Sequence, residues 1–223
     1  MHVQPQRFSG FRSFIGGGAV LAGALMLSAA GQASAEPWRL AALPGDMSLG
    51  NPRATVTVVE YASAACPHCA HFNNDVFPIF KTRYVDTGKV RFVLREFLTP
   101  PTEVAAAGFL LARCAGKGRY FSTLDAFFHG QEAMFRAGDA RKLIYAVGAK
   151  AGLSPTQVTA CVTDPAALAE LNARVERNGM ADMVTYTPTF VINGRNLIQH
   201  GHETNLADID AVIAPLLAED GRS

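Results

Sequence analysis

The chain has no excess of charge of either sign, and this excludes whole classes of partner. Its 223 residues include 20 Lys and Arg and 19 Asp and Glu, which gives a formal net charge of +1 at pH 7. No stretch gathers basic residues into a patch that would attract phosphate groups. We therefore expect neither nucleic acid nor an anionic membrane surface among its partners.

The N-terminal segment lacks acidic residues, cysteine and adjacent arginines. The first cysteine is Cys66, which argues against lipid attachment at a processed N-terminal cysteine, and the missing arginine pair argues against twin-arginine export. What is present is two arginines, an apolar run over 15–30 and small residues that end at Ala35. This pattern predicts a Sec signal peptide over residues 1–35, cleaved after Ala35. A transmembrane anchor is the alternative, but the run is short and rich in Gly and Ala.

No later segment is long and apolar enough to cross a bilayer, so we expect a soluble, periplasmic protein. Disulfides form and persist in that compartment, and the four cysteines therefore count as two possible pairs. One pair is Cys66 with Cys69. The other is Cys114 with Cys161, both on apolar faces of expected helices. Export and the even count favour a structural disulfide there, with two buried free thiols as the alternative.

Cys66 and Cys69 follow the clearest strand of the sequence and begin an amphipathic helix. The strand, 55–59, is five consecutive β-branched residues. The helix shows as apolar and aromatic residues at every fourth position: Phe72, Val76, Phe80 and Tyr84. Pro67 takes the first helical position, where a missing N–H costs nothing. Cys66 is then at the helix N-terminus, where free N–H groups and the helix dipole favour a thiolate, the form that exchanges with disulfides.

Two other uses of a Cys-x-x-Cys motif fit this chain poorly. Zinc binding usually needs a second Cys or His pair at similar spacing, and Cys114 and Cys161 are far apart. Haem attachment needs a histidine directly after the second cysteine, where this chain has Ala70. We therefore favour redox exchange, with no metal and no cofactor beyond the cysteine pair.

The rest of the chain has two strand regions with a helical block between them. Residues 90–94 alternate as a strand, and helical patterns follow from Thr102 to about Gly179. Strand character returns at 189–192, followed by an Asn-Gly hairpin turn and an amphipathic helix over 206–217. The expected order is β-α-β, a helical block, then β-β-α.

This order resembles a thioredoxin-fold protein of the DsbA family. The residues that carry the resemblance are Cys66-Pro67-His68-Cys69 and Thr187-Pro188-Thr189-Phe190. The resemblance covers the chain from about Asp46 to Leu217 and implies an α/β thioredoxin fold with an inserted all-helical domain. The thioredoxin-like domain would comprise 36–98 and 180–223, and the inserted domain 99–179.

The resemblance also implies roles for individual residues. Cys66 would be the exposed cysteine that forms the mixed disulfide with the substrate, and Cys69 the resolving partner. Pro188 would be the cis-proline beside the active site. Pro67, Thr187 and Pro188 would contact the substrate.

His68 and Glu60 complete the expected site. His68 can donate hydrogen bonds and positive charge to the Cys66 thiolate, which lowers the pKa of the thiol. Glu60 ends an apolar strand, and thioredoxin-fold oxidoreductases commonly carry a buried acid at this spacing that moves protons for the inner cysteine. Burial would raise the pKa of that carboxyl. The alternatives are a solvent-facing histidine and an exposed glutamate at the strand end.

The expected function is a periplasmic thiol:disulfide oxidoreductase. It would donate the Cys66–Cys69 disulfide to exported cysteine-containing proteins and depend on a membrane redox partner. Cys-Pro-His-Cys resembles the motif of the strong oxidases, whereas thioredoxins have Gly-Pro between the cysteines. The pKa of the nucleophile differs accordingly, from about 3.5 in DsbA to about 7 in thioredoxin. Thr187 resembles the isomerase branch, so a reductase or isomerase in a pathway such as cytochrome c maturation stays open, as does a non-catalytic binding module. The lead-in before Arg53 is too short for a dimerisation domain, so we expect a monomer.

Overall fold

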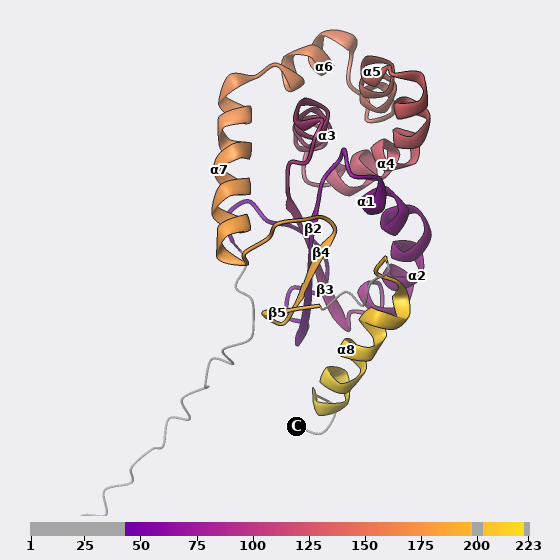
Figure 1. Ribbon diagram of the computed structural model, residues 1–223, viewed down its shortest axis with the longest axis vertical. Coiled ribbons are helices and arrows are strands. Elements are labelled where there is room, and N and C mark those ends of the chain that lie inside the picture. Colours follow the sequence, from indigo (N-terminus) through magenta and orange to yellow (C-terminus); the bar gives the residue numbers. More distant parts are fainter. Residues whose placement is uncertain (1–42, 198–202, 221–223) are drawn as a thin grey trace, which may run out of the picture. The chain divides into compact units, whose positions relative to one another are not determined.

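The computed structural model of the protein describes residues 43–197 and 203–220 (Figure 1). The expected signal peptide, with its cleavage position after Ala35, lies outside these residues. Within the described part, no helix combines the length and the apolar character that crossing a membrane requires.

A mixed sheet of five strands lies at the centre of the described residues, in the order β1-β3-β2-β4-β5. Its strands are β1 (Met47–Gly50), β2 (Val56–Ala62), β3 (Val90–Glu96), β4 (Thr189–Ile192) and β5 (Arg195–Asn196). Strands β2 and β3 run parallel, and the other neighbouring pairs are antiparallel. All seven residues of β2 are buried and both its edges are paired, as its continuous apolar, β-branched run predicts.

The helix that follows the cysteines is interrupted by two π-helical turns. Its parts are α1 (Pro67–His71), η1 (Phe72–Val76), α2 (Phe77–Phe80) and η2 (Lys81–Val85). Pro78 lies in the first turn of α2, directly after η1. Because Pro78 has no N–H to donate, regular α-helical hydrogen bonding cannot continue through it, and the chain changes its helical pitch there.

The inserted block consists of five helices between β3 and β4 (Figure 1). They are α3 (Thr102–Cys114), α4 (Tyr120–Ala137), α5 (Ala140–Lys150), α6 (Pro155–Val162) and α7 (Pro165–Ala181). The side chains of Ser154 and Asp164 cap α6 and α7 by accepting hydrogen bonds from backbone N–H groups of the first turn, and a proline follows each cap. These short polar side chains are why each helix begins where it does.

One hydrophobic core joins the sheet, the interrupted helix, the inserted block and α8 (Leu206–Asp220). Its members include Phe72 and Phe80 near the cysteines, Phe109 and Phe127 in the inserted block, and Ile209 and Ile213 in α8. Gly108 on α3 approaches the loop before the cysteines so closely that a Cβ atom would stand 2.6 Å from the Ala64 Cβ. The inserted block therefore packs directly against the segment that leads into Cys66.

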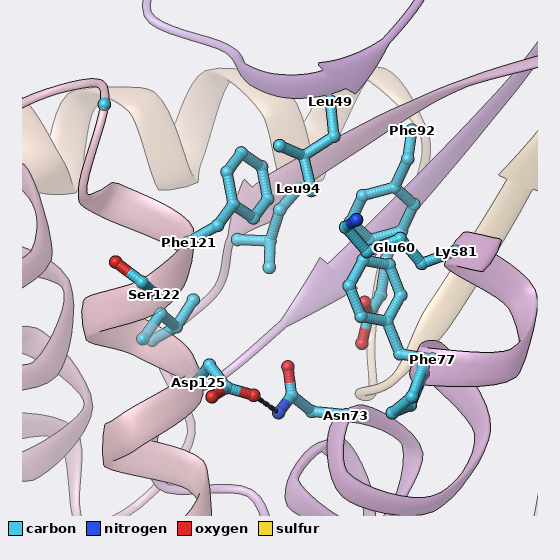
Figure 2. Close-up of a pocket in the computed structure, with 13 residues that line it drawn as sticks. Leu49, Glu60, Asn73, Phe77, Lys81, Phe92, Leu94, Phe121, Ser122 and Asp125 are labelled. Atoms are coloured by element: carbon cyan, nitrogen blue, oxygen red, sulfur yellow. Dashed lines mark hydrogen bonds between the residues drawn. The ribbon is translucent and has the colours of Figure 1, made fainter. Parts of the chain in front are cut away.

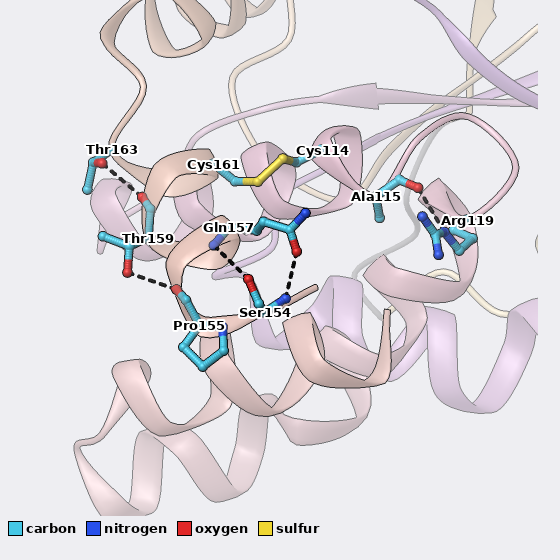
Figure 3. Close-up of a disulfide and its surroundings, with 9 residues drawn as sticks. All are labelled: Cys114, Ala115, Arg119, Ser154, Pro155, Gln157, Thr159, Cys161 and Thr163. Atoms are coloured by element: carbon cyan, nitrogen blue, oxygen red, sulfur yellow. Dashed lines mark hydrogen bonds between the residues drawn. A yellow bond between two sulfur atoms is a disulfide. The ribbon is translucent and has the colours of Figure 1, made fainter. Parts of the chain in front are cut away.

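Cys114 at the end of α3 and Cys161 in α6 are joined by a disulfide (Figure 3). Their Cα atoms are 5.9 Å apart, and 47 positions separate them in the sequence. The bond closes a loop that contains all of α4 and α5. It therefore restrains most of the inserted block in the unfolded chain.

Replacing this pair (Cys114→Ala with Cys161→Ala) should lower the free energy of unfolding by about 2–4 kcal/mol, because the unfolded chain regains the freedom that the closed loop removes. Urea denaturation of the oxidised wild type and the oxidised double variant at one pH measures the difference. Cys66 and Cys69 are retained in both proteins, so their redox state is matched. Equal unfolding free energies would contradict the prediction.

Candidate active site

Cys66 lies where the loop after β2 meets helix α1. It is the N-cap residue of α1, with extended backbone angles of φ −88° and ψ 120°, and Pro67 follows at the start of the helix. The Cys69 N–H donates to the Cys66 sulfur, with 3.4 Å between N and Sγ. The sulfur thus takes the place of the oxygen atom that usually caps a helix. The expected position of Cys66 at a helix N-terminus is confirmed.

The surroundings of Cys66 lower the pKa of its thiol from 9.0 to about 6. The largest cause is a hydrogen bond with the Cys69 side chain, and burial acts against it. The Thr187 side chain and the backbone N–H groups of Cys69 and His68 lower the pKa further. At neutral pH Cys66 is therefore mostly thiolate, which is the nucleophilic form.

Cys69 has the opposite character. It is fully buried, and burial raises the pKa of its thiol well above 9.0. The hydrogen bond with Cys66 and the negative charges of Cys66 and Glu60 raise this pKa further. Both cysteines are free thiols in the structure, and both are buried: the expectation that Cys66 is exposed is wrong, since only 6% of its surface is accessible beneath the surrounding segments. The outer member of the pair thus ionises while the inner member keeps its proton.

Thr187 and Pro188 lie against Cys66, although 121 positions separate Cys66 from Thr187 in the sequence. The peptide bond between Thr187 and Pro188 is cis. The Cys66 thiol donates to the Thr187 carbonyl oxygen, with 3.4 Å between sulfur and oxygen. The Thr187 hydroxyl is buried and finds no partner with hydrogen-bond geometry among the described residues, yet it lies near enough to lower the pKa of Cys66. The fold therefore surrounds Cys66 from two distant parts of the chain.

The His68 ring contacts a residue to which the sequence did not point. Its side chain is 63% exposed, and Nδ1 pairs with Oε1 of Glu203, just before α8. The second oxygen of the same carboxylate lies 3.3 Å from His71 Nε2. The contribution of His68 to the lowered pKa of Cys66 comes from its backbone N–H, not from the ring as the sequence suggested. No motif surrounds Glu203, so only the fold reveals this contact.

Glu60 is buried in the central strand, with 4% of its surface exposed. It stands opposite Leu94 on β3 and Phe190 on β4. Burial, and then the negative charge of Cys66, raise the pKa of its carboxyl from 4.5 to about 8. This burial excludes the alternative of an exposed glutamate at the strand end. A carboxyl with such a pKa can give or take a proton near neutral pH.

A cavity of about 390 Å³ lies beside Glu60 (Figure 2). Phe77 and Phe121 form apolar parts of its wall. Asn73 and Asp125 also line it, and the Asn73 amide donates to the Asp125 carboxylate at 3.0 Å. A space of this size with polar groups on its wall is a setting in which water can carry protons to a buried carboxyl.

Comparison with known proteins agrees with this geometry. Residues 42–213 match the family model described as thioredoxin. The chain belongs to the thioredoxin family. Among solved structures, α-DsbA1 of Wolbachia pipientis shares 27% sequence identity with this member of the family, at a TM-score of 0.71 over 81% of this chain and 94% of that chain. Oxidised BdbD of Bacillus subtilis shares the fold at a TM-score of 0.63, with 22% identity over 79% of this chain and 95% of that chain.

Curated relatives support the same grouping. A Rickettsia conorii protein named as a protein-disulfide oxidoreductase is 32% identical over 169 residues, which are 75% of this chain and 60% of the relative. A Rickettsia typhi protein of the same name is 34% identical over 150 residues, 67% of this chain and 55% of the relative. This thioredoxin-family chain therefore spans somewhat more than half the length of these relatives. The predicted thioredoxin fold with added helices, and its resemblance to DsbA, are confirmed.

Titration of the reduced protein, followed by the ultraviolet absorbance of the thiolate, should show a midpoint at about 6 for Cys66. The folded pKa lies below the unfolded value near 9.0, so this group stabilises the reduced fold fully above pH 9 and loses that effect as the pH falls through 6. The variant Cys66→Ser should lack the step. A wild-type midpoint near 9 would contradict the prediction.

Glu60→Gln should slow disulfide exchange by about tenfold while leaving the fold intact, because the amide cannot carry the proton. The raised pKa also affects stability: because Glu60 ionises less readily in the folded protein, the free energy of unfolding falls as the pH rises from 4.5 through about 8. The free energy of unfolding of Glu60→Gln should therefore increase relative to that of the wild type over that pH range. Stopped-flow exchange rates, and urea unfolding of the reduced proteins across pH, measure the two effects.

Glu103, an exposed glutamate on α3, supplies the matched control as Glu103→Gln. We expect it to leave both pH profiles unchanged. An exchange rate for Glu60→Gln that follows the wild-type pH profile would refute a proton-carrying role for Glu60.

Proposed function

We propose that this protein is a periplasmic thiol:disulfide oxidoreductase that passes the Cys66–Cys69 disulfide to exported cysteine-containing proteins. The observation that carries the proposal is the split between the two thiols. The pKa of Cys66 is about 6, whereas that of Cys69 is raised well above 9.0. Such a pair combines an outer sulfur that attacks and leaves readily with an inner sulfur that holds a proton. The cysteine pair itself is the redox group, without a cofactor or metal.

The reaction starts from the disulfide form. A substrate thiolate attacks Cys66 Sγ, the bond to Cys69 breaks, and Cys69 leaves as a thiolate that takes up a proton. Glu60, whose burial raises the pKa of its carboxyl, supplies that proton. A second substrate thiolate then attacks the substrate sulfur of the mixed disulfide, and Cys66 leaves as a thiolate. The substrate loses two electrons and the cysteine pair gains them.

The substrate chain lies along Thr187 and Pro188 in this proposal. The Thr187 carbonyl oxygen is already 3.4 Å from Cys66 Sγ. An extended peptide held at Cys66 therefore comes within reach of backbone groups of the Thr187 segment, as in strand addition at a sheet edge. Pro67, which directly follows Cys66, is exposed, and in this proposal the peptide also contacts it.

The Cys-Pro-His-Cys motif supports the oxidising direction, because it resembles the strong oxidases. The pKa of about 6 for Cys66 is lowered in the same sense and lies between about 3.5 for DsbA and about 7 for thioredoxin. Groups that stabilise the thiolate stabilise the reduced form, and this makes the disulfide a stronger oxidant. The names of the relatives, protein-disulfide oxidoreductase and DsbA, support the same class of reaction. Reduction or isomerisation in a pathway such as cytochrome c maturation is the second candidate, because Thr187 precedes Pro188 as in isomerases. A non-catalytic binding module would not require two thiols of such different acidity.

A membrane redox partner completes the cycle. The reduced pair has to pass on two electrons before it can oxidise another substrate, and the protein holds no second redox group in the proposal. The N-terminal pattern that ends at Ala35 supports export to the periplasm.

Equilibration with glutathione buffers, read by alkylation of free thiols, tests the direction. We expect a reduction potential closer to the value of about −120 mV for DsbA than to about −270 mV for thioredoxin. A value near that of thioredoxin would overturn the oxidising direction and favour the reductase. Failure of the disulfide form to oxidise a reduced, unfolded protein, together with failure of the dithiol form to reduce a protein disulfide, would overturn the enzymatic proposal and leave the binding module. The matched control is Cys69→Ser, which cannot form the internal disulfide and should therefore trap mixed disulfides at Cys66 without oxidising the substrate.

A further inference from the structure

The loop that carries Thr187 starts directly at the end of α7. Asp182 is the C-cap residue of α7, and only Met183–Thr187 separate it from Pro188. At the far end of this loop the Thr187 carbonyl oxygen contacts Cys66 Sγ at 3.4 Å. A shift of the loop would therefore change the groups that surround the reacting sulfur.

A buried ion pair holds Asp182. The side chain of Arg95, at the end of β3, is 1% exposed. Its Nη1 donates to Asp182 Oδ2 at 2.9 Å, and its Nε and Nη2 each donate to Asp46 at 3.2 Å. All three guanidinium nitrogens of Arg95 thus donate to carboxylates. Because the guanidinium is planar and rigid, these hydrogen bonds fix the directions of the two carboxylates as well as neutralising the charge.

Tyr61 connects both ends of the loop. Its hydroxyl donates to Asp182 Oδ2 at 2.6 Å and accepts from Arg95 Nη1 at 3.0 Å. The same residue pairs with Thr189 across β2 and β4, just after Pro188. One residue of the central strand, Tyr61, therefore contacts the chain at both ends of the loop.

The loop itself has a conformation that needs support. Met183 has a φ of 53°, in the left-handed region that non-glycine residues seldom adopt. The next residue is tied down: the Val184 N–H donates to the Gly179 carbonyl at 2.9 Å, and its side chain packs on the cluster of Val59, Tyr61, Val93 and Val191. Met183 and Tyr186 are 82% and 48% exposed, so apart from these anchors the loop faces solvent.

We propose that Arg95 and Asp182 are positioning residues for the reaction at Cys66: their buried ion pair fixes the loop that presents Thr187 and Pro188 to the sulfur and to the substrate. The hydrogen bonds of both side chains go to one another, to Asp46 and to Tyr61, not to the cysteines. The effect on substrate rests on the proposed function, while the effect on Cys66 does not.

The neighbouring residue provides a matched control. Glu96 follows Arg95 on β3, and its side chain is also buried, with 2% exposed. It pairs with Arg113 on α3 and Arg174 on α7, and it accepts from the Tyr120 hydroxyl at 3.2 Å. Glu96 thus joins a buried ion network of similar size that ties down the inserted block instead of the Thr187 loop.

The experiment compares Asp182→Ala, Asp182→Asn and Glu96→Gln. In Asp182→Ala, Asp46 still pairs with Arg95, so the buried cation keeps a partner and the fold is retained. The loosened loop spends part of its time out of place, so KM for a reduced dicysteine peptide should rise about tenfold with kcat close to the wild-type value. The Cys66 titration midpoint should rise as the Thr187 side chain moves away.

Asp182→Asn keeps an acceptor oxygen and should restore both values. Glu96→Gln should lower the urea midpoint while KM and the Cys66 titration stay as in wild type. The proposal is overturned if Asp182→Ala changes only the unfolding free energy, or if Glu96→Gln moves KM and the titration by the same factor. Should Asp182→Ala fail to fold, Arg95→Lys, which keeps the charge and loses the fork, answers the same question. A wild type that does not turn over the peptide overturns the proposed function, and the Cys66 titration then decides the positioning role alone.

Discussion

The active site depends on strand β2 being buried along its whole length and hydrogen-bonded on both edges. Alternate side chains of a strand point to opposite faces of its sheet. Glu60 therefore faces the cavity on one side, and Tyr61 joins the small cluster on the other. The chain leaves β2 at Ala62 and reaches Cys66 after a loop of three residues. Because β2 cannot shift without breaking two ladders, the acid, the loop anchor and the cysteine keep fixed relative positions.

Charge at this site couples redox state to proton affinity. The Cys66 thiolate raises the pKa of Glu60, and the Glu60 carboxylate raises that of Cys69. When Cys66 is in a disulfide its charge is gone, so Glu60 is a stronger acid than in the reduced protein. The oxidised protein is also the form in which Cys69 must receive a proton as it leaves. In the proposed reaction the carboxyl is thus most acidic in the redox state in which it donates its proton.

The reacting residues were more predictable from the sequence than the distant residues that hold them in place. Cys66, Pro67 and Cys69 are neighbours, so the N-terminal position of Cys66 follows from local rules alone. The same holds for the Asn193-Gly194 turn, whose φ values are 46° and 79°. Local rules also suggested a helix after the cysteines with a kink at Pro78, and the structure interrupts that helix with two π-helical turns, of which only the first ends near Pro78.

Contacts across long sequence separations left no local signal. Glu203 pairs with His68 over 135 positions, and Asp182 pairs with Arg95 over 87. In the sequence, Arg95 and Glu96 look like the polar end of an alternating strand. Burial of these two charged side chains is energetically possible only where distant helices bring opposite charges to them. A pattern of hydrophobic residues cannot encode that, because it depends on where α3 and α7 end up.

Those two adjacent charges explain how one strand end anchors two separate parts of the fold. Their side chains point to opposite faces of the sheet. Glu96 holds Arg113 on α3 and Arg174 on α7, which are helices of the inserted block. Arg95 holds Asp182, where the loop to Thr187 begins. The inserted block and the loop beside the sulfur are thus both anchored at the end of β3, the parallel neighbour of the strand that carries Glu60. A thiolate whose pKa depends on hydrogen bonds from separate segments needs the loop beside it to be held in place, because each of those bonds weakens steeply with distance and angle.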